Sequence, residues 1–416
     1  MISVDQARQM VVDNYRAKQI VLELERVTLD EALGRVLAED LCADTDQPPF
    51  DRSLKDGYAI RSEDVKAVPA ELRVIGESKA GDSRLPRVGA GEAAQVMTGA
   101  AIPGGADTVV MVEEVEAIGP APGTHRNDSF DSASIRIKKS LHAGANVSIR
   151  GNEARKGDVL APRGHRLGVR EISLAASIGV GSPWVFKKPR VGILATGDEL
   201  VPVDSTPGQN QIRNSNSYSL LAMVRKAGAE AILLGMARDN LEDLRRRIAV
   251  GLESSSCLLL TGGVSAGKYD FVEPVLKDSG VEFYFDAVAI RPGKPAVFGA
   301  RGQQFVFALP GNPVSAIVTF HLFVEPLLGL LSGEEPTEPS ILNARLENSF
   351  RQPTGRRGYL PAHYEIRNGE FQVRTVRWRG SSDLAGLARS NCFIVAPENQ
   401  AEFKEGEGVK ILMPSF

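Results

Sequence analysis

The segment over residues 189–333 alternates short apolar runs with amphipathic helical patterns, and this alternation constrains the fold more than any other feature of the chain. The runs follow one another in the order RVGILAT, SYSLLAMVRKAGA, EAILLGMA, NLEDLRRRIAVGLES, CLLLTGG, YDFVEPVLKDSG and QFVFALP. Strands that alternate with helices pair in parallel through right-handed crossovers. The strand-like runs are apolar throughout, as expected when helices cover both faces of a sheet. The sequence therefore predicts a doubly wound, mostly parallel α/β domain.

The rest of the chain predicts an all-β contribution and a mixed one. Residues 46–150 hold short β-rich runs between Gly and Pro turns and indicate an all-β domain. Residues 1–45 and 151–188 have a mixed, partly helical pattern, so we expect one small N-terminal domain into which the β domain is inserted. Residues 334–416 turn β-rich again, and Asn368-Gly369 is typical of a two-residue hairpin turn. We expect a C-terminal β-barrel or sandwich there.

Two local patterns give further expectations. Thr28 and Glu31 have the spacing of a capping box, which predicts a short helix that Gly34 ends. The most apolar stretch, VSAIVTFHLFVEPLLGLL, is interrupted by His321 and Glu325 and is short for a membrane span of roughly 20 residues. We interpret it as a buried helix and expect no membrane contact.

Composition excludes several classes of function. The net charge is -3 with acidic and basic residues interspersed, so we expect no nucleic-acid partner. Cys42, Cys257 and Cys392 are odd in number and far apart, which is neither a disulfide framework nor a zinc site. Unpaired cysteines are typical of the reducing cytoplasm, where we expect the protein to act.

Polar, glycine-bearing loops follow the predicted strands. In a doubly wound sheet, ligands bind beyond the carboxyl ends of the strands. The residues at these positions, together with those of a nearby RPGKP turn, are Thr196, Gly197, Asp198, Glu199, Arg238, Asp239, Gly262, Gly263, Ser265, Gly267, Lys268, Asp270, Arg291, Lys294, Pro310, Gly311, Asn312 and Ser315. We expect them to converge on one edge of the sheet.

The residue types in these loops indicate an anion site with a divalent cation. Glycines let backbone N–H groups approach a phosphate closely, and the start of the following helix favours negative charge. Basic side chains neutralise a bound anion, whereas acidic side chains beside it would not. Mg²⁺ held between carboxylates and phosphate oxygens would explain why acids occur at this site. Singly, each loop could be an ordinary turn or helix cap; their shared position at strand ends favours a site. Neither a G-x-x-x-x-G-K-[ST] nor a G-x-G-x-x-G pattern occurs.

Three residues outside this segment lie in glycine-rich motifs. Asp56 precedes Gly57 in DRSLKDGYAIR, Thr98 precedes a glycine in QVMTGAAIPGG, and Glu153 lies between glycines in SIRGNEARKG. Taken alone, each motif is better explained as a turn.

Together, the motifs resemble one known family, the molybdopterin molybdenumtransferases of molybdenum-cofactor biosynthesis, which include the gephyrin E domain. The matching pieces are DEALGRVLAED, KDGYAI, VMTGAAIPGGADTVV, ATGDEL, NSNSYSL, LTGGVSAGKYDF, RPGKP, LPGNPVSA and GSSDLAGLARSNCFIV, in the order of the family and over nearly the whole chain. This chain departs from the family's common pattern at Glu153, where Asp is usual, and at Arg291, where Lys is usual.

The resemblance implies functions for the motif residues. The implied catalytic residues are Asp56, Thr98, Glu153, Glu199, Asp239 and Asp270, with Glu199, Asp239 and Asp270 also near a metal. The implied cofactor-binding residues are Gly262, Gly263, Ser265, Gly267, Arg291, Lys294, Pro310, Gly311, Asn312 and Ser315. The resemblance also implies a homodimer in which Asp56, Thr98 and Glu153 of one subunit face the anion site of the other.

The implied reaction converts adenylated molybdopterin and molybdate into the molybdenum-bearing product with release of AMP, in the presence of Mg²⁺. A molybdopterin adenylyltransferase would be an expected partner. Two alternatives stay open: the chain could itself be that adenylyltransferase, or it could be a non-catalytic pterin-binding scaffold. ATP-dependent adenylation would identify the first alternative, and the presence of the acids argues against the second.

Overall fold

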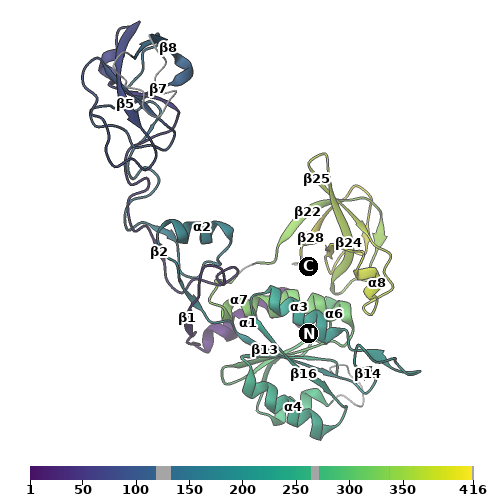
Figure 1. The fold of residues 1–416 in the computed structure, drawn as a ribbon. Coiled ribbons are helices and arrows are strands. Elements are labelled where there is room, and N and C mark those ends of the chain that lie inside the picture. The colour runs from purple at the N-terminus through teal and green to yellow at the C-terminus, as the bar shows by residue number, and fades with distance from the viewer. Residues whose placement is uncertain (119–132, 264–270, 337, 415–416) are drawn as a thin grey trace. The chain divides into compact units, whose positions relative to one another are not determined.

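The computed structural model describes residues 1–118, 133–263, 271–336 and 338–414, which form two compact units (Figure 1). The first unit comprises Met1–Glu39, Arg163–Val169 and Ser182–Phe416. The second comprises Asp40–Pro162 and Arg170–Gly181. The four-part division expected from the sequence is finer than this one, and its boundaries stay a prediction.

A six-stranded sheet forms the centre of the first unit, with strand order β16-β13-β17-β21-β20-β18. The strands are β16 (Glu230–Ala237), β13 (Arg190–Thr196), β17 (Cys257–Thr261), β21 (Gln304–Leu309), β20 (Val297–Arg301) and β18 (Glu282–Phe285). The first four pair in parallel, whereas β20 and β18 are antiparallel additions at one edge. The predicted doubly wound, mostly parallel sheet is confirmed.

Helices cover both faces of this sheet (Figure 1). They are α1 (Val4–Ala17), α3 (Asn216–Lys226), α4 (Leu241–Ser254), α5 (Val272–Asp278), α6 (Pro313–Thr319) and α7 (Glu325–Leu331), with a π-helical turn at Phe320–Val324. Alternate residues of each strand point to opposite faces. Leu259 and Phe307 therefore pack against α1, α6 and α7 on one face, while Leu258 and Val306 pack against α4 and α5 on the other.

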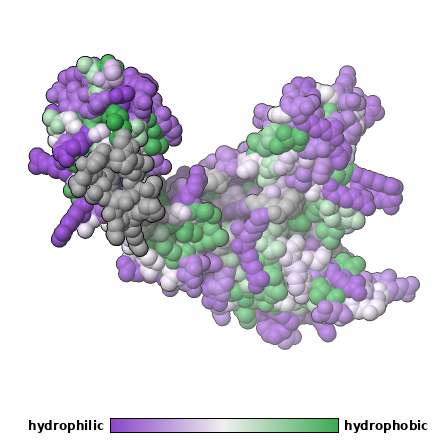
Figure 2. All heavy atoms as spheres, turned by 45° about the horizontal axis from the view of Figure 1, so that its top comes forward, coloured by the Kyte–Doolittle hydropathy of each residue, from purple (hydrophilic) through white to green (hydrophobic). Residues whose placement is uncertain are grey.

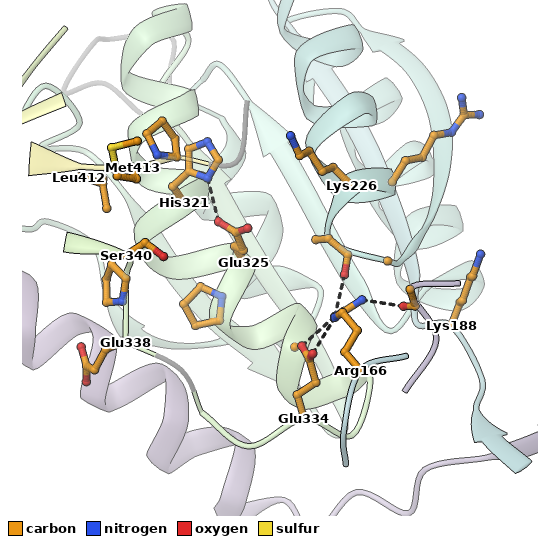
Figure 3. Close-up of a pocket in the computed structure, with 18 of the residues that line it drawn as sticks. Arg166, Lys188, Lys226, His321, Glu325, Glu334, Glu338, Ser340, Leu412 and Met413 are labelled. Carbon is orange, nitrogen blue, oxygen red and sulfur yellow. Dashed lines mark hydrogen bonds and ion pairs between the residues drawn. The ribbon is translucent and has the colours of Figure 1, made fainter. Parts of the chain in front are cut away.

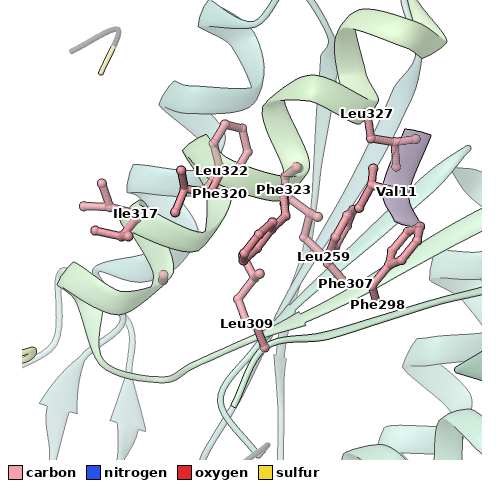
Figure 4. Close-up of a cluster of buried hydrophobic side chains, with 14 of the residues drawn as sticks. Val11, Leu259, Phe298, Phe307, Leu309, Ile317, Phe320, Leu322, Phe323 and Leu327 are labelled. Atoms are coloured by element: carbon pink, nitrogen blue, oxygen red, sulfur yellow. The ribbon is translucent and has the colours of Figure 1, made fainter. Parts of the chain in front are cut away.

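The apolar stretch over Pro313–Leu331 lies within the first of these two cores. Figure 4 shows Phe320 and Phe323 of this segment beside Phe307 and Leu309 of the sheet. The segment is long and apolar enough to cross a membrane by composition, but 83% of it is buried inside the fold, which is typical of a core helix. The prediction of a buried helix is confirmed. The face of the molecule drawn in Figure 2 is largely hydrophilic, with separate apolar patches.

The prediction of a short helix after Thr28 is wrong. Thr28 and Glu31 do approach each other, with Oγ1 and Oε2 3.3 Å apart, but the segment forms turns and no helix. Gly34 has a φ of +74°, and its N–H donates to Leu167 O at 2.8 Å. Pairing with the segment around Leu167 overrides the local capping signal. Nearby, β1 (Leu24–Arg26) pairs with β12 (Trp184–Phe186).

The C-terminal part of the first unit is a closed barrel. Its strands are β24 (Arg357–Arg367), β25 (Glu370–Thr375), β22 (Ile341–Leu346), β28 (Gly408–Leu412) and β26 (Cys392–Ala396), and β26 closes the barrel on β24. Asn368 and Gly369 form the predicted hairpin turn with φ angles of +51° and +80°. Strand β19 (Ile290–Arg291) pairs with the start of β24 and so connects the α/β part to the barrel. Shorter elements are β14 (Leu200–Val201), β15 (Ile212–Arg213), β23 (Phe350–Arg351), β27 (Glu402–Phe403) and α8 (Leu384–Leu387).

The second unit contains the predicted inserted β domain. Its sheet has the order β7-β4-β6-β5-β9-β8. The strands are β7 (Thr108–Met111), β4 (Gly57–Ile60), β6 (Glu92–Val96), β5 (Ala70–Ser78), β9 (Ser134–Ile137) and β8 (Val115–Ile118). The chain enters and leaves through paired ladders, β2 (Leu41–Cys42) with β11 (Val159–Ala161) and β3 (Arg52–Ser53) with β10 (Val147–Ser148). Helix α2 (Val169–Ser177) and 3-10 turns at Ser62–Val65 and Val112–Glu114 complete the described elements.

Candidate active site

A pocket of about 730 Å³ lies at the carboxyl ends of β13, β17 and β21, where the topology predicts a ligand site. We call it the strand-end pocket. Its lining includes the predicted residues Glu199, Asp239, Gly262, Gly263, Pro310, Gly311 and Asn312. Four loops that are separated by up to about a hundred residues in the sequence thus meet around one pocket, because their strands are parallel neighbours.

Asp239 is held in place by the loop after β13. Its Oδ1 accepts a hydrogen bond from Thr196 Oγ1 at 2.8 Å, and its Oδ2 accepts one from the Asp198 N–H at 3.3 Å. Asp198 Oδ1 in turn accepts from the Asp239 N–H at 3.2 Å. These reciprocal bonds join the ends of two neighbouring strands and fix the orientation of the Asp239 carboxylate.

Glu199 is the more available of the two acids in this pocket. Its carboxylate lies over Gly197, where an added Cβ would come within 2.6 Å of Oε2. Gly197 has a φ of +146°, a conformation that favours glycine, and an added Cβ would also displace the Glu199 carboxylate. Among the described residues, the Glu199 carboxylate has no hydrogen-bond or ion-pair partner.

The paired glycines after β17 are explained first by packing. A Cβ at Gly262, which has a φ of +94°, would lie 2.3 Å from Thr196 O, and one at Gly263 would lie 2.6 Å from Val272 Cγ2. Gly311 lies beside Gly262, where an added Cβ would make an ordinary contact of 3.5 Å with the Gly262 Cα. The glycines therefore let three loops approach one another. The predicted residues Ser265, Gly267 and Asp270 lie outside the described part of the chain.

A second pocket, of about 650 Å³, adjoins the first and is cationic. Arg291, Lys294, Arg351 and Arg356 line it, and no acidic residue does so among the described residues. Arg351 pairs with Glu402 at 2.6 Å, whereas the other three have no carboxylate partner in the described chain. Burial, and secondly the neighbouring charge of Arg356, lower the pKa of Arg291. We call this the cationic pocket, and its composition suits an oxyanion.

The structure thus divides the predicted residues between two adjoining pockets. Ser315, which is buried, lines the cationic pocket with Arg291 and Lys294. Pro295, Pro310 and Asn312 line both pockets and mark their junction. The barrel contributes further lining residues that were not predicted as site residues, namely Arg351, Arg356, Ser381 and Ser382. Ser381 and Ser382 belong to the motif GSSDLAGLARSNCFIV, which matched the family but was given no function. The basic pair in TGRRGYL was the one sequence signal that could have indicated Arg356.

Asp56, Thr98 and Glu153 belong to the second unit, whereas both pockets belong to the first. Asp56 Oδ1 accepts hydrogen bonds from the Thr98 N–H at 2.7 Å and from Thr98 Oγ1 at 3.0 Å. The backbone bond, followed by the side-chain bond, lowers the pKa of Asp56. Glu153 pairs with Arg52 at 2.5 Å. Asp56 is therefore hydrogen-bonded directly to Thr98, and Glu153 forms an ion pair with Arg52.

No group of three His, Cys, Asp or Glu side chains that could hold a metal is found within the described part of the chain. The strand-end pocket nevertheless supplies two carboxylates, from Glu199 and Asp239. Mg²⁺ is commonly held by one or two carboxylates together with substrate phosphate oxygens and water. The donor set of this pocket fits such an ion.

A further pocket of about 460 Å³ contains none of the predicted residues (Figure 3). Four of its charged groups form two pairs: Arg166 binds Glu334 through Nε at 2.6 Å, and His321 Nδ1 lies 2.8 Å from Glu325. Lys188, Arg225 and Lys226 also line this pocket. Arg166 and Glu334 connect two segments of the fold here, and the two pockets described above hold the predicted cofactor-binding residues that the structure describes.

Comparisons with known proteins agree with this architecture. Residues 2–179 match the MoeA N-terminal region (domain I and II), residues 192–329 a probable molybdopterin binding domain, and residues 343–413 the MoeA C-terminal region (domain IV). The chain is 32% identical to a molybdopterin molybdenumtransferase of Haemophilus influenzae, over 99% of this chain and 98% of that protein. It is 34% identical to one of Bacillus subtilis, over 94% and 90% of the two chains. A crystal structure of the molybdopterin biosynthesis moeA protein from Pyrococcus horikoshii OT3 superimposes with a TM-score of 0.83 at 30% identity, over 100% of both chains.

The fold, the matched regions and the curated relatives define a multidomain transferase of molybdenum-cofactor biosynthesis. The chain belongs to the molybdopterin molybdenumtransferase family. The family and the enzyme class expected from the sequence motifs are confirmed.

Proposed function

We propose that this protein inserts molybdenum from molybdate into adenylated molybdopterin and releases AMP. The observation that carries the proposal is the pair of adjoining pockets. One has carboxylates and closely packed glycine loops; the other has three basic side chains without acidic partners among the described residues. A pterin ester with its phosphates and a separate oxyanion are the two kinds of reactant that such a pair accommodates.

The residues of the chain bind and orient the reactants in this scheme. Arg291, Lys294 and Arg356 hold an oxyanion in the cationic pocket by charge-assisted hydrogen bonds. Glu199 and Asp239 would hold Mg²⁺, which when bound supplies Lewis-acid neutralisation of phosphate charge. Cleavage of a phosphoanhydride depends mostly on positioning and charge stabilisation, so no protein nucleophile is required.

We further propose that the enzyme is a homodimer with its site between subunits. Asp56, Thr98 and Glu153 of one copy would face the strand-end pocket of the other. A molybdopterin adenylyltransferase would supply the adenylated substrate. The reaction is placed in the cytoplasm, which is supported by the free thiols of Cys42, Cys257 and Cys392.

The test is AMP release from adenylated molybdopterin, measured with and without molybdate and Mg²⁺. We expect release to require both, and Glu199→Gln to lower its rate by about 100-fold, because the substitution removes a carboxylate charge near the reacting phosphates without changing side-chain size. Glu253→Gln, at the end of α4 and outside both pockets, is the matched control and should keep the wild-type rate.

Two results would contradict the proposal. ATP-dependent adenylation of molybdopterin without molybdate-dependent AMP release would identify an adenylyltransferase. Tight binding of the pterin with no turnover under either condition would identify a scaffold.

A further inference from the structure

The loop over residues 310–312 separates the strand-end pocket from the cationic pocket. It follows β21 and leads into α6, and both Pro310 and Asn312 line the two pockets. A displacement of this loop would move one pocket wall relative to the other.

Asn312 occupies the N-cap position of α6 but does not cap the helix with its side chain. An N-cap Asn ordinarily accepts a hydrogen bond from the first turn, which stabilises the helix by about 1 kcal/mol. Here Asn312 Nδ2 donates to Ser381 Oγ at 2.9 Å, and the Val314 N–H of the first turn donates to Ser381 O at 3.0 Å. The barrel segment thus caps the helix, and the Asn312 side chain fixes the loop to the barrel.

Asn216 holds the same loop from the opposite side. Its Nδ2 donates to Gly311 O at 2.7 Å and to Thr261 Oγ1 at 2.8 Å. A carbonyl oxygen can only accept, so the orientation of the Asn216 amide is fixed by the Gly311 contact. Two side-chain amides therefore attach the loop to α3 and β17 on one side and to the barrel on the other.

We propose that the 310–312 loop is a rigid partition that sets the relative position of the two pockets, with Asn216 and Asn312 as positioning residues. This inference rests on the proposed function, in which two reactants occupy separate pockets. Reactants bound this way react only when the pockets are correctly aligned, and a misplacement of about 1 Å can lower a rate by about 100-fold. The charged binding groups, such as Glu199 and Lys294, lie on other loops, whereas Asn312 and Ser381 line the pockets with uncharged side chains.

Steady-state kinetics of Asn312→Ala and Ser381→Ala test the proposal. We expect kcat for molybdate-dependent AMP release to fall about 10- to 100-fold, because alignment is lost. KM for molybdate should stay within about threefold, since positioning residues do not bind it. The double variant should be no slower than the slower single variant, because both remove the same bond. Ser381→Thr keeps the hydroxyl and should recover most of the rate.

Ser390→Ala is the matched control. Its hydroxyl donates to Leu387 O at 2.7 Å in the same barrel segment, and it lines neither pocket. We expect a wild-type kcat from this variant. A rise in KM for molybdate with an unchanged kcat would instead show that Ser381 contacts the oxyanion directly, and would overturn the proposal.

Hydrogen exchange separates a failure of this inference from a failure of the proposed function. In Asn312→Ala, the amide of Val314, which donates to Ser381 O in the wild type, should exchange at least about tenfold faster, whether or not the enzyme is active. Unchanged exchange, or faster exchange with an unchanged kcat, would overturn the partition. A wild-type protein without molybdate-dependent AMP release would overturn the proposed function, while the exchange rates would still decide whether the Asn312 side chain holds the loop.

Discussion

Asp56 illustrates how one residue pair can set the protonation of a proposed catalytic acid. Thr98 donates to Asp56 through its N–H and its hydroxyl, and both bonds lower the pKa of Asp56. Thr98→Val removes only the hydroxyl bond. We expect the pKa of Asp56 to rise in this variant but to stay below its ordinary value, because the backbone bond, the larger cause, is kept. NMR titration of the side-chain carboxyl measures this.

The sign of the accompanying pH dependence follows from the depressed pKa. The interaction stabilises the folded state above the unfolded pKa of Asp56, and this stabilisation is lost as the pH falls through the folded pKa. If Asp56 must be ionised for catalysis, the acidic limb of the activity profile should move to higher pH in Thr98→Val. An unchanged Asp56 pKa would show that the hydroxyl has no electrostatic effect.

The sequence located many pocket residues because they follow strands of one parallel sheet. It could not locate Arg356, which reaches the cationic pocket through the pairing of β19 with β24, between segments that are more than sixty residues apart. The sequence could not predict the hydrogen bond between Asn312 and Ser381 for the same reason. Contacts of this kind depend on tertiary pairing, and no local periodicity encodes them.

At the scale of elements, the apolar face between the sheet and α6–α7 stabilises the domain that carries both pockets. Phe307 is fully buried there, and its ring centroid lies 4.7 Å from that of Phe298. We expect Phe307→Ala to lower the free energy of unfolding by about 3–5 kcal/mol, through lost burial and the cavity it leaves. Urea unfolding followed by circular dichroism measures the loss.

Leu233→Ala on β16 is the control for that prediction, since the Leu233 side chain is 44% exposed. It should change the unfolding free energy by no more than about 0.5 kcal/mol. Equal effects of the two substitutions would show that this core does not limit stability.

Elements with strong periodicity were predictable, whereas one that depended on a short local signal was not. Helix α4 could be predicted because Leu244, Ile248 and Leu252 repeat along one buried face. The capping pattern at Thr28 and Glu31 is not followed by a comparable repeat of buried apolar residues. The chain instead forms turns that pair with the Leu167 segment. A capping motif contributes about 1 kcal/mol, which tertiary hydrogen bonds readily outweigh.

At the scale of the whole molecule, the proposed catalytic residues are divided between two units of one chain. Glu199 lines a pocket of the first unit, and Asp56 belongs to the second. If the site forms between subunits, Asp56→Ala and Glu199→Gln homodimers should both lose most of their activity, by about 100-fold for Glu199→Gln, for different reasons. A heterodimer of the two variants places both substitutions in one of its sites and leaves the other site intact.

Purified heterodimers, isolated through a different affinity tag on each variant chain, should therefore recover about half of the wild-type activity per dimer, because one of two symmetric sites is complete. A heterodimer of the wild type with a doubly substituted chain, carrying both Asp56→Ala and Glu199→Gln, is the control. In that dimer each site contains one substituted residue if sites form between subunits, so it should be inactive. The opposite pattern, with an inactive first heterodimer and a half-active second one, would show that Asp56 and Glu199 of the same chain act together.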